Sequence, residues 1–340
     1  MWGLDIMKKT TTILLIIALL FTCTVPNYTY ASTYKTEVTS IKEAQLKINQ
    51  LKLLTAKIIN NINNTLSTED EHDENTIKIL SIGNSFSQDT AYYLHEIAKS
   101  AGVNLVVANL YSSGCSLERH HKYANQNEKA YTYYKWTSRG LKIYKAKTMK
   151  DAIIDEEWDY ITLQQASGES GNYDTYQPYL SDLINYIKDN SKNDELKFAL
   201  NMTWAYSSRS TNNNFDYYNK NQLTMYNSII KAYEQALKET EIEILIPCGT
   251  AIQNARSNRY LNAVGNELTS DGYHLSYGLG RYIAGLTMFQ TLIVNNEKHD
   301  INISKDIDFF PKTKDCTEEL ASLAKKAAIN AVKNPLKITK

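Results

Sequence analysis

The segment KILSIGNSFS at residues 78–87 decides how we expect this chain to fold. A short apolar run at 77–82 leads through Gly83 to Ser85, just before a stretch predicted to be helical from near Asp89. An unbroken apolar run of this length is typical of a strand buried on both faces, as in a parallel sheet. The segment therefore predicts a strand that turns sharply into a helix, with Ser85 at the turn.

Further apolar runs follow along the chain, each separated from the next by a stretch with helical periodicity. This alternation predicts a three-layer α/β/α domain with a central parallel sheet of about five strands. Residues 130–147 do not fit a helix well, and we expect a small hairpin there, inserted in the third unit. The predicted strands are 77–82, 104–110, 158–163, 197–202 and 242–247, and the predicted helices are 89–101, 149–156, 176–189, 217–239, 277–294 and 315–333.

Composition excludes several classes of protein. The 340 residues contain 37 Lys and Arg and 37 Asp and Glu, and this zero formal net charge argues against a nucleic-acid binder. A chain of this length can bury a core without a disulfide framework. The sequence has no G-x-G-x-x-G motif, no P-loop and no zinc-like cysteine spacing, so we expect neither a cofactor nor a metal.

The first 31 residues are predicted to be a cleavable export signal, which makes the protein secreted or attached to the cell surface. Met7-Lys8-Lys9 gives a positive start, residues 13–21 are apolar but short for a membrane span, and Ala31 closes a cleavage site. A retained anchor is the alternative. After cleavage an odd number of cysteines remains, of which at most one pair could form: Cys115, Cys248 and Cys316.

Residues 32–75 are predicted to be an amphipathic helix followed by an acidic linker. The helix covers 36–66, and the linker, TEDEHDEN, covers 68–75, so the main domain is expected to span 76–340. Two interpretations stay open: a helix lying on the main domain, or a short coiled coil or surface spacer through which copies self-associate. The stripe falls at alternating three- and four-residue steps: Ile41, Ala44, Ile48, Leu51, Thr55, Ile58, Ile62 and Thr65.

Three polar residues suggest nucleophilic catalysis. Ser85 is expected at the carboxyl end of a parallel strand, where α/β folds place ligand sites, although it could simply cap the following helix. Asp271 precedes His274 by three residues in a loop containing Gly272. At that spacing the carboxylate can bind one imidazole nitrogen and leave the other free as a general base.

A serine nucleophile also needs hydrogen-bond donors for the oxyanion that it creates. Gly114 follows the second predicted strand, and its N–H is a candidate donor. Gln164 and Gln165 follow the third. Successive strand residues face opposite ways, so one of the two amides should reach the site. We favour Gln165, with Gln164 as the alternative.

Four other residues have two interpretations each. His120 could contact a substrate or be a solvated loop residue. Trp204 and Tyr206 could form a wall on which a sugar stacks, or pack under a loop. Cys115 could pass for a nucleophile, but no Asp and His arrangement favours it over Ser85.

Residues from about 77 to 300 resemble the SGNH/GDSL hydrolase superfamily, and in particular its DUF4886 branch. The resemblance implies a flavodoxin-like α/β/α fold. It rests on motifs that occur in the superfamily's order: IGNSFS at 82–87, SSGCSLERH at 112–120, WDYITLQQASGESG at 158–171, MTWAY at 202–206 and DGYHLS at 271–276.

By this resemblance Ser85 is the nucleophile, His274 the general base and Asp271 the acid that orients it. The N–H groups of Ser85 and Gly114 would line the oxyanion hole.

The chain departs from the superfamily's pattern twice. Asn84 replaces the Asp of the usual Gly-Asp-Ser, and no Gly-x-Asn-Asp follows the third strand, where Gln165 is a plausible substitute.

The resemblance implies a secreted serine esterase that needs no cofactor. Short acyl groups, acetyl in particular, on a small molecule or a glycan are the expected substrate. The alternatives are a lipase or thioesterase of the same superfamily, and a non-catalytic glycan-binding or surface protein on the same scaffold.

Overall fold

The computed structural model describes residues 75–297 and 299–339, together with residues 44, 46–52, 54–55 and 57 of the N-terminal part. The chain divides into two units, Met1–Glu71 and His72–Lys340. The predicted export signal, nearly all of the acidic linker and the remainder of the predicted helix 36–66 lie outside the described residues. No helix among those described is both long and apolar enough to cross a membrane.

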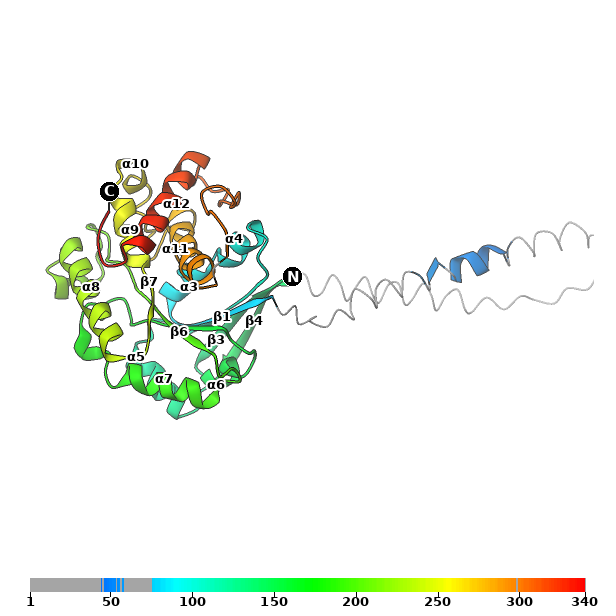
Figure 1. The fold of residues 1–340 in the computed structure, drawn as a ribbon, viewed down its shortest axis with the longest axis horizontal. Coiled ribbons are helices and arrows are strands. Elements are labelled where there is room, and N and C mark those ends of the chain that lie inside the picture. Colours follow the sequence, from blue (N-terminus) through cyan, green and yellow to red (C-terminus); the bar gives the residue numbers. More distant parts are fainter. Residues whose placement is uncertain are drawn as a thin grey trace, which may run out of the picture. The chain divides into compact units, whose positions relative to one another are not determined.

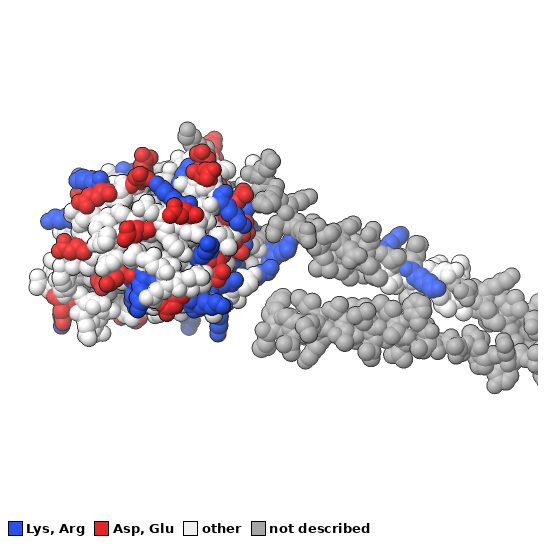
Figure 2. Space-filling view, turned by 90° about the horizontal axis from the view of Figure 1, so that it is seen from below, with Lys and Arg blue, Asp and Glu red and all other residues white. Residues whose placement is uncertain are grey.

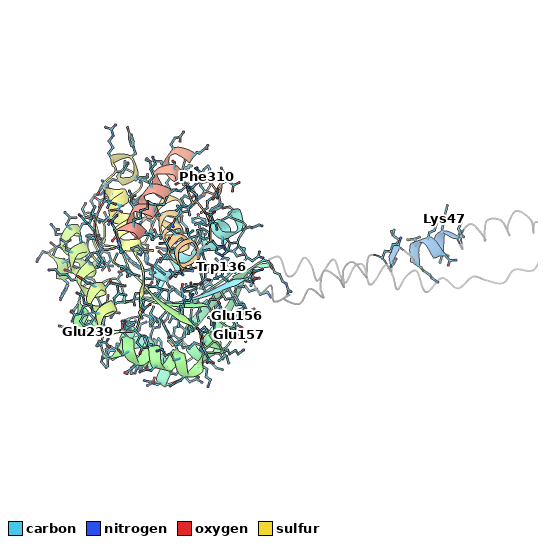
Figure 3. All side chains as sticks on the ribbon, viewed as in Figure 1. Lys47, Trp136, Glu156, Glu157, Glu239 and Phe310 are labelled. Carbon is cyan, nitrogen blue, oxygen red and sulfur yellow. The ribbon has the colours of Figure 1, made fainter. Side chains whose placement is uncertain are left out.

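The described residues of the first unit are helical. Lys47 lies on this helix (Figure 3), and the Thr55 hydroxyl donates a hydrogen bond to the Leu51 carbonyl at 2.8 Å. Its apolar side chains are exposed, Leu46 by 61% and Leu51 by 54%.

The second unit contains one seven-stranded sheet in the order β4-β3-β2-β1-β5-β6-β7. The five predicted strands are confirmed as β1, β2, β5, β6 and β7, and each pairs in parallel with its neighbours among these five. The strand order reverses beside β1, so the carboxyl ends of β1 and β5 mark the place where such folds bind ligands. The strands are β1 Ile77–Gly83, β2 Leu105–Tyr111, β3 Tyr131–Thr137, β4 Gly140–Lys147, β5 Tyr160–Leu163, β6 Lys197–Asn201 and β7 Ile244–Ile246.

The predicted hairpin is also present, and it extends the sheet at one edge. Its two strands, β3 and β4, are antiparallel to each other, and β3 is antiparallel to β2. Trp136 lies on β3 opposite Val107 of β2 (Figure 3). The sheet is therefore mostly parallel rather than wholly so, and it has two strands more than predicted.

Helices cover both faces of the sheet, which confirms the three-layer architecture (Figure 1). One layer contains α3 Ser85–Ala91, α4 Leu94–Ser100, α9 Cys248–Arg256, α10 Arg259–Asn262, α11 Leu279–Phe289 and α12 Glu318–Lys333. The other contains α5 Leu117–Asn125, α6 Met149–Ile153, α7 Tyr179–Asn190 and α8 Gln222–Glu239. Short helical turns complete the fold: Tyr173–Thr175, Asn213–Tyr218 and the π-helical Gln290–Asn296 after α11.

The helices differ from the prediction in two ways. The predicted helix 89–101 is two helices, α3 and α4, and the first of them begins four residues early, at Ser85. Helices α5, α9 and α10 were not predicted. Two of these helices begin at a residue whose side chain caps the helix. Ser116 caps α5, and Asn258 caps α10.

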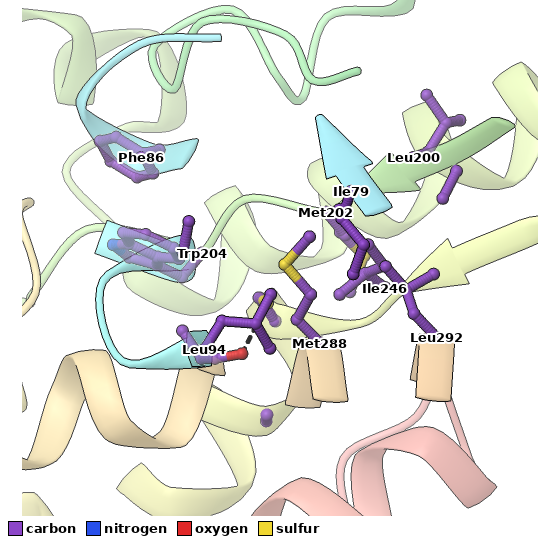
Figure 4. Close-up of a cluster of buried hydrophobic side chains, with 14 of the residues drawn as sticks. Ile79, Phe86, Leu94, Leu200, Met202, Trp204, Ile246, Met288 and Leu292 are labelled. Carbon is purple, nitrogen blue, oxygen red and sulfur yellow. Dashed lines mark hydrogen bonds between the residues drawn. The ribbon is translucent and has the colours of Figure 1, made fainter. Parts of the chain in front are cut away.

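The core lies between the sheet and the helix layers. Figure 4 shows part of it, where Ile79 of β1 and Met202 after β6 lie near Met288 of α11, all of them without exposed surface. Cys115, Cys248 and Cys316 are buried free thiols. Acidic and basic side chains are interspersed on the face of the molecule in Figure 2.

Candidate active site

The turn after β1 is built for close packing. Gly83 has no room for a side chain, because a Cβ there would lie 2.7 Å from the Ser87 hydroxyl and 3.1 Å from the Gln164 side chain. Asn84 caps α3, and its Oδ1 accepts the Phe86 N–H at 3.0 Å. Ser85 is therefore the first residue of the helix and not its cap, which removes the simplest structural explanation of this serine.

Three polar side chains meet at this turn. Ser85 Oγ lies 2.8 Å from His274 Nε2, and His274 Nδ1 lies 2.6 Å from Asp271 Oδ2. Ser85 and His274 are half-buried, and Asp271 is exposed. The three residues thus form one continuous hydrogen-bonded chain at the carboxyl edge of the parallel strands.

The loop fixes the orientation of Asp271. Asp271 Oδ1 accepts the N–H groups of Tyr273 at 3.1 Å and His274 at 2.8 Å. Partial burial raises the pKa of Asp271, but the hydrogen bonds from the His274 side chain and from these two N–H groups outweigh it, so the net pKa lies below its ordinary value of 3.8. Gly272 makes the turn possible with a φ of +97°, and a Cβ there would lie 2.9 Å from Ser210 Cα.

The loop rests on buried aromatic side chains. Trp204 stacks on Phe86 with ring centroids 4.2 Å apart (Figure 4), and its indole N–H donates to the Tyr273 carbonyl at 2.7 Å. Tyr206 is also wholly buried, and its hydroxyl lies 2.9 Å from the Ser167 hydroxyl. The prediction of a sugar-stacking wall at Trp204 and Tyr206 is therefore wrong, because neither ring has a surface for a ligand.

The loop containing Gly114 is tied to the same turn. Asn84 Nδ2 donates to the Cys115 carbonyl at 3.0 Å, and the Ser112 N–H donates to the Gly83 carbonyl at 3.1 Å. Gly114 itself is exposed, has a φ of +54° and faces open space where a Cβ would point. Among the described residues no backbone oxygen accepts its N–H.

Both glutamines after β5 bind other groups of the protein. The Gln165 amide donates to the Thr175 carbonyl at 2.9 Å and to its hydroxyl at 3.0 Å. Both of its N–H bonds are used there, so the predicted oxyanion role of Gln165 is wrong in this geometry. Gln164 instead donates to Asn84 Oδ1 at 2.9 Å and accepts from the Asn201 amide at 2.9 Å. Gln164 thus helps to fix the orientation of Asn84, the residue that caps α3.

Two other candidates lie away from solvent. His120 is fully buried, with Nδ1 2.9 Å from the Tyr131 hydroxyl, and burial lowers its pKa to about 3. It is thus a neutral core residue and neither a solvated loop residue nor a substrate contact. Burial also raises the pKa of Cys115 to about 11, which disfavours the reactive thiolate. No cluster among the described residues offers three His, Cys, Asp or Glu ligands to a metal.

Two residues that shape the site, Asn84 and Asp89, were given no role from the sequence alone. Asn84 has the residue type and position of an N-cap, a signal that could have identified it. Asp89 follows Ser85 by four residues and so shares its helix face. It is buried and accepts the Leu275 N–H at 2.8 Å.

Comparison with known proteins identifies a family and a set of similar structures. Residues 78–331 match the family model described as Domain of unknown function (DUF4886). A solved DUF4886 family protein from Bacteroides uniformis ATCC 8492 is 38% identical, over 78% of this chain and 97% of that chain, with a TM-score of 0.72. No curated protein matches this chain.

More distant structures share less. An acetylxylan esterase from Geobacillus stearothermophilus is 12% identical over 64% of this chain and 94% of that chain, with a TM-score of 0.43. TesA is 10% identical over 64% of this chain and 98% of that chain, with a TM-score of 0.41.

The first prediction concerns Asn84, whose amide donates a hydrogen bond to the Cys115 carbonyl and accepts one from Gln164. In Asn84→Asp a carboxylate would face the Cys115 carbonyl without a hydrogen to donate. We expect the free energy of unfolding to fall by about 1–3 kcal/mol, measured by urea denaturation at pH 7.

Asn221→Asp is the matched control, because Asn221 caps α8 from an exposed position and accepts the Thr224 N–H at 2.9 Å. A carboxylate can still accept that bond, so the change should stay below about 0.5 kcal/mol. Equal losses in the two variants would contradict the role given to the Asn84 amide.

The second prediction concerns pH. Because the folded pKa of Asp271 is lowered, its carboxylate stabilises the fold above pH 3.8, and this contribution is lost as the pH falls through the folded value. Asp271→Asn should therefore be less stable than the wild type at pH 7, and the difference should shrink as the pH is lowered below 3.8. Urea denaturation over this pH range measures it, and a difference that stays constant with pH would refute the assignment.

Proposed function

The chain belongs to the DUF4886 family, and we propose that it is a serine esterase that hydrolyses short acyl esters, acetyl esters above all, carried on carbohydrate. The observation that carries the proposal is the chain of hydrogen bonds from Ser85 through His274 to Asp271, at 2.8 Å and 2.6 Å. Nucleophile, base and orienting acid each have the partner that their role needs.

In the proposed reaction, Ser85 Oγ attacks the ester carbonyl while His274 Nε2 takes its proton. Asp271 stabilises the imidazolium that forms. The tetrahedral intermediate then expels the alcohol, which receives the proton from His274, and leaves an acyl group on Ser85. Water attacks this acyl-enzyme with His274 again as base, which releases the acid and restores the serine.

The oxyanion is proposed to bind the N–H groups of Ser85 and Gly114. The hydrogen bonds from Asn84 to Cys115 and from Ser112 to Gly83 support this, because they hold the Gly114 loop beside the nucleophile turn. Donors fixed before the reaction stabilise an oxyanion without a cost of reorganisation during it.

Packing at the site favours a short acyl group. A long acyl chain needs an apolar channel beside the nucleophile. Two of the aromatic side chains near His274, Phe86 and Trp204, are buried against each other and therefore offer no wall to such a channel. The carbohydrate part of the proposal rests on the superfamily resemblance and on the predicted export.

The third prediction tests the nucleophile. The wild type should release p-nitrophenol from p-nitrophenyl acetate, and Ser85→Ala should lower kcat at least 10³-fold because no other hydroxyl has the His274 partner. Ser138→Ala, an exposed serine beyond β3, is the control and should keep full activity. A serine-directed phosphonate should label the wild type on the peptide containing Ser85 only.

Retained turnover in Ser85→Ala, or an adduct on another residue, would overturn the catalytic assignment. Binding of glycans with no turnover in the wild type would favour the non-catalytic alternative. Faster cleavage of p-nitrophenyl laurate than of the acetate would favour a lipase or thioesterase.

We also propose that the protein is exported and that its N-terminal helix self-associates at the cell surface or in the medium. The apolar stripe supports self-association, as do the exposed side chains of Leu46, Leu51 and Leu54.

The fourth prediction is that N-terminal sequencing of protein recovered from a culture medium begins at Ser32. A chain retained with residues 1–31 attached would instead indicate an anchor.

A further inference from the structure

A buried carboxylate lies one turn along α3 from the nucleophile. Asp89 is 2% exposed, follows Ser85 by four residues and therefore lies on the same face of the helix, about 6 Å further along its axis. Its Oδ2 accepts the Leu275 N–H at 2.8 Å, and its Oδ1 lies 2.8 Å from Arg281 Nη2. Both of its oxygens thus have a partner.

These contacts connect α3 to the general base at two points. His274 places its imidazole on Ser85, and the next backbone N–H, that of Leu275, is bound by Asp89. The peptide that carries the imidazole is thus held by the same short helix that carries the nucleophile. A shift of this peptide along α3 would break both hydrogen bonds together.

Arg281 of α11 holds the Asp89 carboxylate in place. The guanidinium packs against two aromatic rings, 4.4 Å from the centroid of Tyr92 and 4.0 Å from that of Tyr277. The Tyr93 hydroxyl in turn donates to the Tyr277 carbonyl at 2.7 Å. The Arg281 side chain is largely buried, and its contacts with both rings favour the orientation in which it binds the carboxylate.

We propose that Asp89 is a positioning residue for the general base. It sets the distance between His274 and Ser85 through the Leu275 N–H, and Arg281 keeps it in the orientation that this requires. The inference rests on the proposed function, since it gives Asp89 a role in the same reaction.

The charged groups that act on Asp89 come from two elements, Arg281 from α11 and His274 and Asp271 from the loop. Burial raises the pKa of Asp89 to about 6, against the lowering effects of Arg281 and the Leu275 N–H. At pH 8 the Asp89 carboxylate of the wild type is therefore ionised. Kinetic measurements at this pH compare each variant with the charged form.

The fifth prediction tests the hydrogen bond to Leu275. Asparagine has one acceptor oxygen, so in Asp89→Asn the amide NH₂ faces a donor whichever way it turns, either the Leu275 N–H or Arg281. We expect kcat for p-nitrophenyl acetate to fall about 10- to 100-fold with KM unchanged within about twofold, because the base and not the substrate moves.

Asp315→Asn is the matched control. Asp315 also accepts a backbone N–H of this region, that of Leu279 at 3.3 Å, but the bond does not involve the peptide beside His274. This variant should lose stability and keep kcat within about threefold. Thermal melts of both variants separate loss of fold from loss of positioning.

A second variant separates positioning from general damage. In the double variant Asp89→Asn, Arg281→Met no guanidinium opposes the amide, so the Asn oxygen can turn to the Leu275 N–H. We expect a higher kcat than in Asp89→Asn alone, whereas independent damage would make it lower.

The inference is overturned if Asp89→Asn keeps kcat within threefold, if Asp315→Asn loses as much, or if the double variant is slower than the single one. A wild type without esterase activity would instead refute the proposed function, so the two failures are distinguishable.

Discussion

The hydrogen bond between Ser85 and His274 is the contact on which the rest of the site depends. It joins residues 189 positions apart, so neither local sequence can make it alone. Strand β1 delivers the serine to the edge of the sheet, and several anchors bring the loop to it. Asp89 binds the Leu275 N–H, the Trp204 indole binds the Tyr273 carbonyl, and the Gly272 carbonyl accepts the Ser207 N–H at 2.8 Å. These anchors hold the loop on both sides of His274, so the imidazole is positioned by the fold as well as by its own hydrogen bonds.

Beneath the nucleophile lies a row of buried amides. Asn84 bonds Gln164, Gln164 bonds Asn201, and the Asn201 amide also donates to the Thr90 hydroxyl at 3.2 Å. Buried polar groups are costly when unpaired, so each amide in this row restricts the orientation of the next. Position 84 therefore needs both an acceptor and a donor. An amide can accept from Gln164 and at the same time donate to the Cys115 carbonyl, whereas an ionised carboxylate can only accept.

The sequence was informative where local pattern decides structure. Unbroken apolar runs identified all five parallel strands, and the spacing of Asp271 and His274 identified a pair that does form. The sequence did not reveal features that depend on contacts between residues far apart in the chain. Thr175 takes the Gln165 amide, and helix α9 is buried on all sides, so it shows no apolar stripe to predict it from. The aromatic Trp204 was placed on the right loop, but its burial against Phe86 has no local signal.

The most direct test of the central claim is a crystal structure of the protein inhibited by a serine-directed phosphonate, which mimics the tetrahedral intermediate. The account predicts phosphorus bonded to Ser85 Oγ, with His274 Nε2 still within hydrogen-bond reach. It also predicts a phosphoryl oxygen about 2.7–3.1 Å from the N–H groups of Ser85 and Gly114. A phosphoryl oxygen directed away from both N–H groups, or phosphorus bonded to a different side chain, would contradict it.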